Sequence, residues 1–599
     1  MSNQQIKGIA GKTLRVNLTN GTIVKEDTDS KLFRNFLGGR GVGAAILYKE
    51  LAPGVDPLGP DNKLVFAVGL LEGTMAPGAN KITVSFKSPA TNTICWSLAG
   101  GHVAPELKFA GYDGIIIEGK SPKPVYLSIN GDNVELKDAS ALWRKETHDT
   151  EDAIRAELKE PMAKVITIGP AGENQVAFAC IQADYYREFG RGGGGSVMGS
   201  KNLKAIAVRG RGYIEVHNPD KLAEVTDKVN QILANHPKAQ ARKKFGTNEM
   251  IEGINSLGFW SVRNFQHGYF DGVEQINSNT FKKDVVFSDA SCYGCSIVCG
   301  KNSRNTKNPY FSVAVEGPEF ETLSLLGADC GINSWNYVIK ASDICDRLGM
   351  DSISAGAVVA FAMELYEKGI ITKETTDGLE LKFGNGEALC QMLESIAYRR
   401  GFGDTLANGS KSVGEKFNAL NWAPQVKGLE FAAYDPRGAK GMGLTYATSP
   451  KGAHHMTSPT MGVEIAQNNR FSEGGKGAMV AETQQLLAIV DSMILCASMR
   501  FALNLTQQLE LLEAVTGIAI TDEEGLQIGK NILTIERLFN DREGFTRKDD
   551  DLPKRFLEEQ LVIGASAGHT VNLEPMLDEY YAVMGFDKDG KPFKDNISF

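Results

Sequence analysis

Short runs of alternating apolar and polar residues dominate the first 213 positions of the chain, and glycine-containing turns separate them. The turns Asn20-Gly21 and Gly131-Asp132 each lie between two such runs, which predicts two β-hairpins. Two further runs are apolar enough to be buried strands. No internal repeat is visible in the sequence. The strands predicted in this way are residues 13–18, 22–24, 113–118, 124–130, 133–137 and 204–209.

The pattern changes at Asn218-Pro219-Asp220, after which apolar residues recur every three or four positions. A proline in the first turn supports a helix that begins there. Further helices are predicted at 354–368, ended by Gly369, and after Asn385, ended by Gly401. The apolar positions of the first helix are Leu222, Val225, Val229, Ile232 and Leu233.

This order of elements predicts an α+β protein with a β-rich domain followed by two mainly helical ones. A glycine-rich stretch that begins at Gly428 marks the second boundary. The predicted domains are residues 1–213, 214–427 and 428–599.

Composition narrows the function classes. With 599 residues, 42% of them hydrophobic, the chain can bury large cores. Its formal net charge of −9 argues against binding to a nucleic-acid backbone. No apolar run reaches the roughly 18 residues that span a bilayer, and the N-terminus lacks the apolar core of a signal peptide. We therefore expect a cytoplasmic protein.

Three of the nine cysteines lie close together, at Cys292, Cys295 and Cys299, with the spacing C-x2-C-x3-C. Clustered cysteines in a reducing compartment are typical of a metal centre. The spacing favours an iron–sulfur cluster, because a zinc ribbon would need a second C-x2-C pair. A fourth ligand is needed, and spacing alone does not choose it. The candidates are Cys330, Cys345, Cys390 and Cys496.

Three other motifs suggest chemistry but do not identify it. The glycine-rich run from Gly190 to Ser200 could hold a phosphate with its backbone N–H groups, or form a tight structural turn. The pair His454-His455 could serve acid/base chemistry. Glu319 and Glu321, in the segment Gly-Pro-Glu-Phe-Glu, could do the same or be solvated charges.

Taken together, these segments resemble the tungsten-containing aldehyde:ferredoxin oxidoreductase family over essentially the whole chain. Matches this numerous and in the same order are very unlikely by chance. The matching segments are Phe109-Ala-Gly-Tyr-Asp113, Ile168-Gly-Pro-Ala-Gly-Glu173, Gly190-Arg-Gly-Gly193, 198–208, Gly317-Pro-Glu-Phe-Glu321, Tyr434-Asp-Pro-Arg-Gly438 and Leu552-Pro-Lys-Arg-Phe-Leu-Glu-Glu559.

The resemblance implies a saddle of two β-sheets under the cofactor, covered by two helical domains. It implies tungsten held by two pyranopterins, with molybdenum as the alternative metal, and one [4Fe–4S] cluster. The resemblance leaves open whether a magnesium ion bridges the pterin phosphates. Within this resemblance, Cys496 completes the cluster ligands, because Asp491-Ser-Met-Ile-Leu-Cys496 matches a family motif in which Ile494 replaces a glycine.

The resemblance also assigns residues to the pterins and to the reaction. Glu321 is expected to act as base and His455 as donor to the aldehyde carbonyl, and the reverse assignment stays open. The expected cofactor-binding residues are Lys81, Arg187, Glu188, Gly190, Arg191, Asp346, Met350, Asp351, Arg437, Asp491 and Leu495.

The implied reaction is oxidation of a small aldehyde to its acid, with electrons passed to ferredoxin or a ferredoxin-like small subunit. Two alternatives remain: a low-potential reductase of carboxylic acids or aromatic thioesters, and a non-catalytic electron-transfer subunit that carries the cluster. The loops near 240–275 and 455–475 are expected to select the aldehyde.

Three departures from the family pattern qualify these expectations. Lys81 replaces an arginine between cluster and pterin, and Leu98 replaces an asparagine that contacts magnesium. Some members bridge two subunits with iron through an E-x-x-H motif, where this chain has Lys340 and Asp343. We therefore expect that any homodimer forms without interfacial iron.

Overall fold

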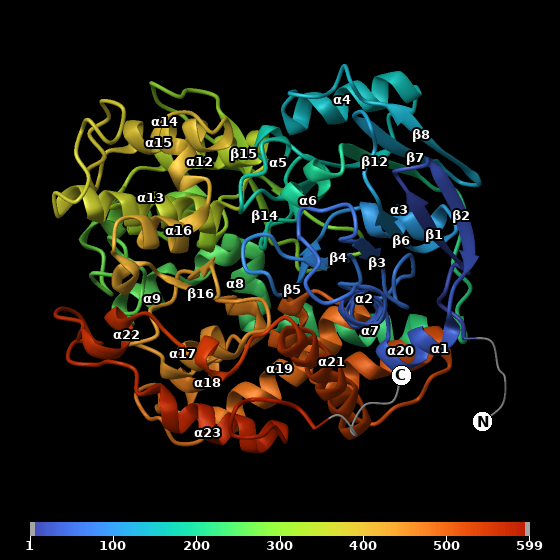
Figure 1. Cartoon of the computed structure of the whole chain (residues 1–599). Coiled ribbons are helices and arrows are strands. Elements are labelled where there is room, and N and C mark those ends of the chain that lie inside the picture. The colour runs from blue at the N-terminus through green and yellow to red at the C-terminus, as the bar shows by residue number, and fades with distance from the viewer. Residues whose placement is uncertain (1–5, 594–599) are drawn as a thin grey trace.

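The computed structural model describes residues 6–593, and its N-terminal part contains two six-stranded sheets (Figure 1). Their strand orders are β2-β1-β6-β3-β4-β5 and β8-β7-β12-β9-β10-β11. The strands of the first sheet are β1 (Lys12–Asn17), β2 (Thr22–Asp27), β3 (Leu64–Ala67), β4 (Ile82–Lys87), β5 (Ile94–Ala99) and β6 (Tyr112–Glu118). Those of the second are β7 (Val125–Asn130), β8 (Asn133–Asp138), β9 (Lys164–Thr167), β10 (Ile181–Ala183), β11 (Arg187–Phe189) and β12 (Leu203–Arg209).

The two sheets have the same topology. Adding six to the number of each strand in the first sheet gives the strand order of the second sheet. β1 pairs in parallel with β6, and β7 pairs in parallel with β12, while the other neighbouring strands are antiparallel. The sequence did not show this repeat, because strand order and direction are retained while the residues differ. The prediction of a two-sheet domain is confirmed.

The predicted hairpins are confirmed by the register of their strands. β1 pairs with β2 from Lys12 opposite Asp27 to Asn17 opposite Thr22. Along β1, Leu14 and Val16 are fully buried while their neighbours are partly exposed, as the alternation requires.

Six helices between these strands were not predicted. Helix α2 illustrates the reason, because its first turns are rich in glycine, which has a low helix propensity. A Cβ at Gly43 would lie 2.2 Å from Ser85 Oγ, so glycine here lets α2 pack directly on β4. The helices are α1 (Ser30–Phe36), α2 (Gly39–Glu50), α3 (Val103–Phe109), α4 (Thr147–Leu158), α5 (Pro170–Glu173) and α6 (Gly194–Ser200).

The rest of the described chain is mainly helical, as predicted. Helix α7 (Pro219–Asn235) begins after Asn218, whose side chain accepts the backbone N–H of Lys221. Helix α13 spans Ser352–Glu367, and Asn385 caps α14 (Gly386–Ala397). The prediction that the helix after Asn385 continues to Gly401 was wrong, because α14 ends at Ala397.

A small sheet, which was not predicted, holds the cysteine motif. Its strands are β13 (Val286–Ala290), β14 (Gly300–Arg304) and β15 (Ala314–Glu316). The three clustered cysteines lie in the loop that joins β13 to β14.

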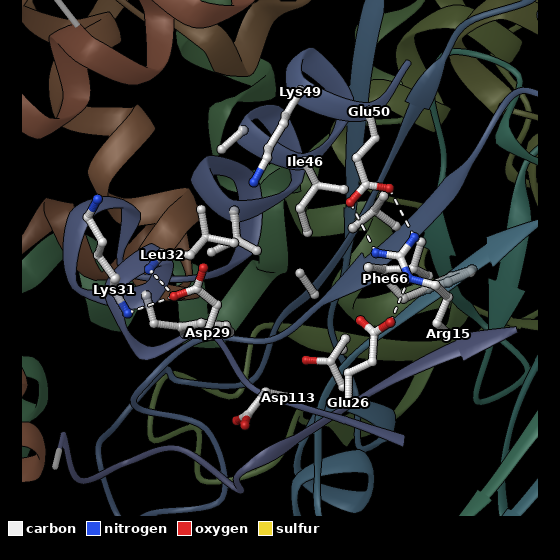
Figure 2. Close-up of a pocket in the computed structure, with 18 of the residues that line it drawn as sticks. Arg15, Glu26, Asp29, Lys31, Leu32, Ile46, Lys49, Glu50, Phe66 and Asp113 are labelled. Carbon is white, nitrogen blue, oxygen red and sulfur yellow. Dashed lines mark hydrogen bonds and ion pairs between the residues drawn. The ribbon is translucent and has the colours of Figure 1, made fainter. Parts of the chain in front are cut away.

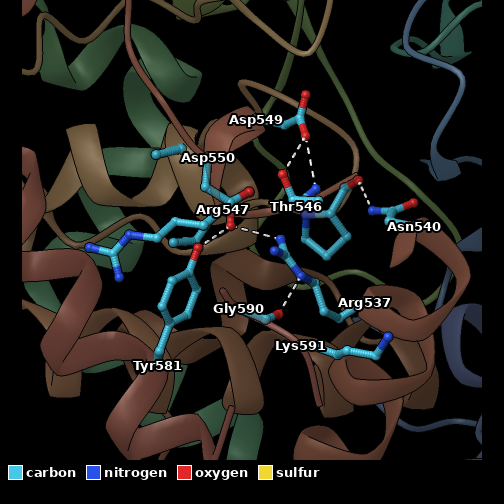
Figure 3. A network of polar contacts seen from close by, with 12 residues as sticks. Arg537, Asn540, Thr546, Arg547, Asp549, Asp550, Tyr581, Gly590 and Lys591 are labelled. Carbon is cyan, nitrogen blue, oxygen red and sulfur yellow. Dashed lines mark hydrogen bonds and ion pairs between the residues drawn. The ribbon is translucent and has the colours of Figure 1, made fainter. Parts of the chain in front are cut away.

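A buried polar network ties the C-terminal helices together (Figure 3). Asp550 is fully buried and accepts contacts from Lys427 Nζ and Arg537 Nη1, both at 2.7 Å, and from the hydroxyl of Tyr581. Nearby, Asn540 of α21 (Asp522–Arg542) donates to the carbonyl of Pro450 at 2.6 Å. This contact fixes the start of the loop that leads to His455.

The largest hydrophobic core includes residues from all three predicted domains, so the boundaries at 213 and 427 stay predictions. Within residues 6–593, no helix is long and apolar enough to cross a membrane.

Candidate active site

Four cysteines line one cavity of about 290 Å³, which we call the thiol cavity. They are Cys292, Cys295, Cys299 and Cys496, so the structure brings the distant Cys496 to the clustered three. The other candidates for the fourth ligand, Cys330, Cys345 and Cys390, are buried elsewhere.

Four thiols around one cavity supply the number of ligands that a [4Fe–4S] cluster needs. A tetrahedral zinc ion would draw its thiolates to within about 4 Å of one another. Across the described residues, no group of three Cys, His, Asp or Glu side chains is arranged to hold one metal ion. A cubane cluster occupies the space between its four thiolates, and the four cysteines here line such a space.

The cysteine loops are anchored on the N-terminal domain. The backbone N–H of Tyr293 donates to the carbonyl of Gly101 at 3.1 Å, and Asn80 Nδ2 donates to the carbonyl of Tyr293 at 3.2 Å. The backbone N–H of Cys496 donates to the carbonyl of Gly78 at 2.9 Å. Both cysteine-bearing segments are thus positioned by the loop before β4.

Lys81 lies at the boundary of the thiol cavity. A Cβ at Gly100 would lie 2.9 Å from Cys292 Sγ and 3.1 Å from Lys81 Nζ, so thiol and ammonium flank the same glycine. Although burial disfavours its charge, the thiolates of Cys496 and Cys292 raise the pKa of Lys81. A permanent positive charge therefore adjoins the predicted cluster.

Two acidic side chains face each other in the same cavity. Burial, followed by the charge of Glu188, raises the pKa of Asp346 well above its usual value, and burial raises that of Glu188. A carboxyl pair that retains a proton both donates and accepts hydrogen bonds, as the edge of a pterin ring requires. Arg187 also lines the cavity and pairs with Glu316. These donors and acceptors fit a pterin beside a cluster.

The two predicted pterin motifs contact equivalent loops, one before β4 of the first sheet and one before β10 of the second. Leu495 forms a β-bridge with Ala79, and Met350 forms one with Ala179. At the next position, the N–H of Cys496 binds the Gly78 carbonyl, and that of Asp351 binds the Phe178 carbonyl at 3.0 Å.

Arg191 and Asp351 join three elements near the catalytic loop. Arg191 Nε lies 3.1 Å from Asp351 Oδ2, and Nη1 donates to the carbonyl of Ala453 at 2.9 Å. Asp351 also caps α13 through the N–H of Ile353. The ion pair therefore positions the loop directly before His454.

Asp491 is reached by Arg40, whose Nη1 lies 3.4 Å away and whose other nitrogens bind Glu536 at 2.8 Å each. Asp491 is not among the residues that line the thiol cavity.

Seven of the eleven predicted cofactor-binding residues line neither the thiol cavity nor the cavity that contains Glu321 and His455. They are Gly190, Arg191, Met350, Asp351, Arg437, Asp491 and Leu495. Arg437 is buried and binds Asp435, the carbonyl of Glu559 and the carbonyl of Phe265, so its guanidinium already has protein partners. Its cofactor role stays a prediction that these contacts do not favour. Gly190 borders open space, but a Cβ at Gly192 would lie 2.2 Å from Cys95 Sγ. Packing thus accounts for part of the glycine run, and phosphate binding stays a prediction.

A second cavity, of about 370 Å³, contains both expected catalytic residues, and we call it the Glu–His cavity. His455 Nε2 lies 3.5 Å from Glu321 Oε1. Glu321 Oε2 accepts the backbone N–H of Ala433 at 2.9 Å. Oε1 of Glu321 and Nδ1 of His455 are buried and lack a hydrogen-bond partner in the described part of the chain. Both atoms thus retain hydrogen-bonding capacity that a molecule bound in the cavity would satisfy.

Burial sets the protonation of this pair. It raises the pKa of Glu321 to about 7. Burial, together with the charges of Arg191 and Lys451, lowers the pKa of His455 to about 3. The contact is therefore not an ion pair near neutral pH, because the imidazole carries no charge. A carboxyl poised near 7 beside a neutral imidazole is suited to general acid/base catalysis.

The two cavities adjoin each other. Thr247, Glu319 and Ser498 line both, and Thr247 Oγ1 donates to Glu319. Electron transfer and acid/base chemistry would thus take place on either side of one shared wall.

Sequence reasoning missed part of this lining. The expected loops near 240–275 and 455–475 contribute residues such as Met250 and Met461, but the short helix η7 (Ala497–Phe501) was not foreseen. The sequence feature that could have indicated η7 is its position directly after Cys496, a predicted cluster ligand. Leu98 lines the thiol cavity, and Lys340 and Asp343 pair with each other at 3.0 Å.

A third cavity, of about 410 Å³, lies between β1, α1 and α2 and carries no comparable chemistry (Figure 2). Arg15 neutralises two of its carboxylates, with hydrogen bonds to Glu50 at 2.9 and 3.0 Å and to Glu26 at 3.1 Å. Asp29 caps helix α1.

Comparison with known proteins agrees with the motifs. The family model of the aldehyde ferredoxin oxidoreductase N-terminal domain matches residues 13–210, and that of domains 2 and 3 matches residues 224–598. The tungsten-containing aldehyde ferredoxin oxidoreductase of Pyrococcus furiosus is 42% identical over 595 residues, which cover 98% of each chain. The aliphatic sulfonate oxidoreductase, WOR-like subunit, of the same organism is 32% identical over 97% of this chain and 95% of its own.

Among solved structures, the active-site complex BamBC of benzoyl coenzyme A reductase in complex with 1,5-dienoyl-CoA has a similar fold. Its TM-score is 0.84 at 28% identity, and the match covers 99% of this chain and 96% of that one. The family models and the identity over nearly the full length give one conclusion: this chain belongs to the aldehyde ferredoxin oxidoreductase family.

Proposed function

We propose that this chain oxidises an aldehyde by the reaction RCHO + H₂O → RCOOH + 2 e⁻ + 2 H⁺ and passes the electrons to ferredoxin or a ferredoxin-like small subunit. The observation that carries the proposal is the Glu–His cavity, which contains a poised acid/base pair and shares a wall with the four thiols. Relatives named tungsten-containing aldehyde ferredoxin oxidoreductases support the same reaction.

The residues present fit a tungsten–pterin cofactor and a [4Fe–4S] cluster. Cys292, Cys295, Cys299 and Cys496 would hold the cluster, and Glu188 with Asp346 would bind a pterin edge. When bound, the metal centre supplies a two-electron acceptor and the cluster a one-electron carrier. Molybdenum remains the alternative metal. Magnesium at the pterin phosphates is less favoured, because Leu98 presents a hydrocarbon side chain to the cavity.

The side chains of this chain would manage protons. Glu321 Oε1, which lacks a protein partner among the described residues, is placed to accept a proton from the attacking water. Neutral His455 would donate a ring N–H to the aldehyde oxygen, and the reverse assignment is the alternative. Arg191 holds the histidine loop through the carbonyl of Ala453 and so orients the imidazole.

Two other functions remain to be separated from this one. A low-potential reductase of carboxylic acids or aromatic thioesters would use the same site, and the likeness to a benzoyl coenzyme A reductase complex makes it the second candidate. A non-catalytic electron-transfer subunit would not need the poised Glu321–His455 pair. Cytoplasmic location and a homodimer without interfacial iron stay predictions.

The deciding experiment uses anaerobically purified protein. Metal analysis should give about one tungsten and four irons per chain, and a panel of aldehydes should reduce a viologen dye. Zinc without tungsten would overturn the cofactor assignment. Reduction of acids or thioesters by reduced viologen, with no aldehyde oxidation, would select the reductase.

A further inference from the structure

Three cationic side chains surround one aromatic ring in the wall of the Glu–His cavity. Lys238 Nζ lies 4.3 Å, Arg242 Cζ 5.0 Å and Arg500 Cζ 5.3 Å from the ring centroid of Phe501. Lys238 and Arg242 are four residues apart on helix α8 (Pro237–Phe245), so they project from one face of it. Arg500 and Phe501 belong to η7, which follows the cluster ligand Cys496.

The positive charges of this group are under-compensated. Arg242 pairs with Glu249 at 3.0 Å. In contrast, neither Lys238 nor Arg500 makes an ion pair or hydrogen bond to the residues described, and Arg500 Nε is buried without a partner. Like charges held together in a partly buried site repel one another, and an unpaired buried charge is costly. A ligand that brings a negative charge would complete the site.

The pKa of Arg500 is consistent with a site that lacks a compensating negative charge. Burial, followed by the charge of Arg242, lowers the pKa of Arg500 to about 10. The guanidinium is still protonated at neutral pH, so its field acts on whatever enters the cavity.

The rest of the cavity defines the shape of such a ligand. Eight apolar side chains line the cavity together with the cations and the Glu321–His455 pair. They are Met250, Phe320, Met456, Pro459, Met461, Val463, Ala497 and Phe501. A ligand that uses all three parts of this lining has a reactive group at Glu321–His455, an apolar body and an anionic group at the cations.

Burial distinguishes a small ligand from a protein partner. Arg242 is 4% exposed, whereas Lys243 and Lys244 on the same helix are exposed. An acidic protein docking on this face would meet Lys243 and Lys244, and also the exposed Lys238. Arg242 is covered, and Arg500 is only partly exposed with its Nε buried. A small anion inside the cavity is the partner that both guanidinium groups can contact.

We propose that the substrate is an aldehyde that bears a carboxylate remote from the aldehyde carbon, and that Arg500, with Lys238, binds that carboxylate. The proposal rests on the aldehyde oxidation proposed above and specifies its substrate class. The remote carboxylate is not consumed, because only the aldehyde C–H is oxidised and water supplies the new oxygen.

The kinetic test compares matched aldehydes with a viologen dye as acceptor. The pairs are succinic semialdehyde with butanal, and 4-carboxybenzaldehyde with 4-methylbenzaldehyde. The native protein should favour the carboxylate of each pair in kcat/KM. Arg500→Gln should lower kcat/KM for the carboxylates about 10- to 100-fold, mainly through KM, because hydrogen bonds to charged groups are the strong ones. Neutral aldehydes should change by less than about twofold.

Two controls bracket this result. Lys243→Gln removes a charge from the exposed side of the same helix and should leave both aldehydes of each pair unchanged. Arg500→Lys keeps the charge without the planar fork and should retain part of the preference.

Binding measured by calorimetry tests the proposal without turnover. Succinate should bind the purified holoenzyme at least about tenfold more tightly than butyrate, and Arg500→Gln should remove the difference. If no aldehyde is oxidised but this preference is present, the proposed reaction fails while the carboxylate site stands.

Three results would overturn the carboxylate site. One is equal kcat/KM for charged and neutral aldehydes in the native protein. Another is an equal loss for both in Arg500→Gln, which would place Arg500 at the reacting carbon. The third is an effect of Arg500 seen only with ferredoxin and not with viologen, which would make it a docking residue.

Discussion

Nε2 of His455 lies 3.5 Å from Oε1 of Glu321, and burial shifts the pKa of the two groups in opposite directions. The carboxyl is raised to about 7 and the imidazole is lowered to about 3. The pair therefore changes charge in one step near neutral pH, and that step belongs to the carboxyl.

The pH dependence of kcat/KM should show a single acid limb from this pair. Glu321 must be deprotonated to act as base, so activity should rise as pH increases through about 7 and fall roughly tenfold per unit below it. No limb from His455 is expected between pH 5 and 9, because its pKa lies well below that range. Rates with a neutral aldehyde at constant ionic strength test this. A limb near 4 or 5 would contradict the raised carboxyl.

Replacing the carboxyl should abolish chemistry and spare the cofactor. Glu321→Gln retains the size and an acceptor for the N–H of Ala433 but removes the base. Turnover should fall by about 10²- to 10⁴-fold, the usual contribution of a general base. Tungsten and iron content should stay at native levels. Unchanged turnover would remove Glu321 from the mechanism.

Iron content should identify the fourth cluster ligand. Cys496→Ser should reduce bound iron sharply and remove the low-temperature electron paramagnetic resonance signal of the reduced cluster. Cys330→Ala serves as the control, because Cys330 is buried in a separate part of the helical region. A native signal in Cys496→Ser, or a loss in Cys330→Ala, would reassign the ligand.

The charge of Lys81 should raise the reduction potential of the cluster. Its ammonium and the thiol of Cys292 flank Gly100, so Lys81 favours the added electron. Lys81→Gln should lower the midpoint potential by an amount on the order of tens of millivolts. Lys123→Gln, an exposed lysine distant from the thiols, should leave it unchanged. A redox titration that gives the same potential for all three proteins would contradict the prediction.

Asp550 should be important for stability rather than for activity. Asp550→Asn would leave Lys427 and Arg537 buried without their counter-charge, which costs about 3–5 kcal/mol and lowers Tm. Asp578→Asn, which breaks an exposed pair with Arg547, is the matched control and should cost under about 1 kcal/mol.

The same aspartate predicts how stability depends on pH. Burial alone would raise the pKa of Asp550, but Lys427 and Arg537 outweigh burial and hold it below its usual value. Its contribution to stability is therefore present above the ordinary carboxyl pKa and is lost as pH falls through the lowered native one. Acid unfolding of Asp550→Asn should lack this component.

Local patterns in the sequence were enough for the hairpins and for the capped helices. The alternation around Asn20-Gly21 and the helix start at Asn218-Pro219 depend only on neighbouring residues, and both were predicted correctly. Helix α2 was missed because its glycines are explained by a strand 40 residues away, which spacing along the chain does not reveal.

The candidate site also contains some residues that local sequence patterns reveal and others that only the fold brings together. The clustered cysteines were visible from spacing, whereas the choice of Cys496 needed either the family motif or the fold that brings it to the same cavity. Arg500 gave no signal in the sequence, because its significance depends on Lys238 and Arg242, which lie some 260 residues earlier. Charge clustering of this kind appears only when the chain is folded.

The repeated topology of the two sheets has a consequence for the direction of electron flow. The loops before β4 and β10 each offer an equivalent backbone carbonyl, at Gly78 and at Phe178, to the last residue of a six-residue motif. That last residue is Cys496 on one side and Asp351 on the other. The platform is thus symmetric in these backbone contacts and asymmetric in the residue that makes them. We therefore expect electrons to leave on the side of Cys496, where Cys292, Cys295 and Cys299 complete the set of four thiols.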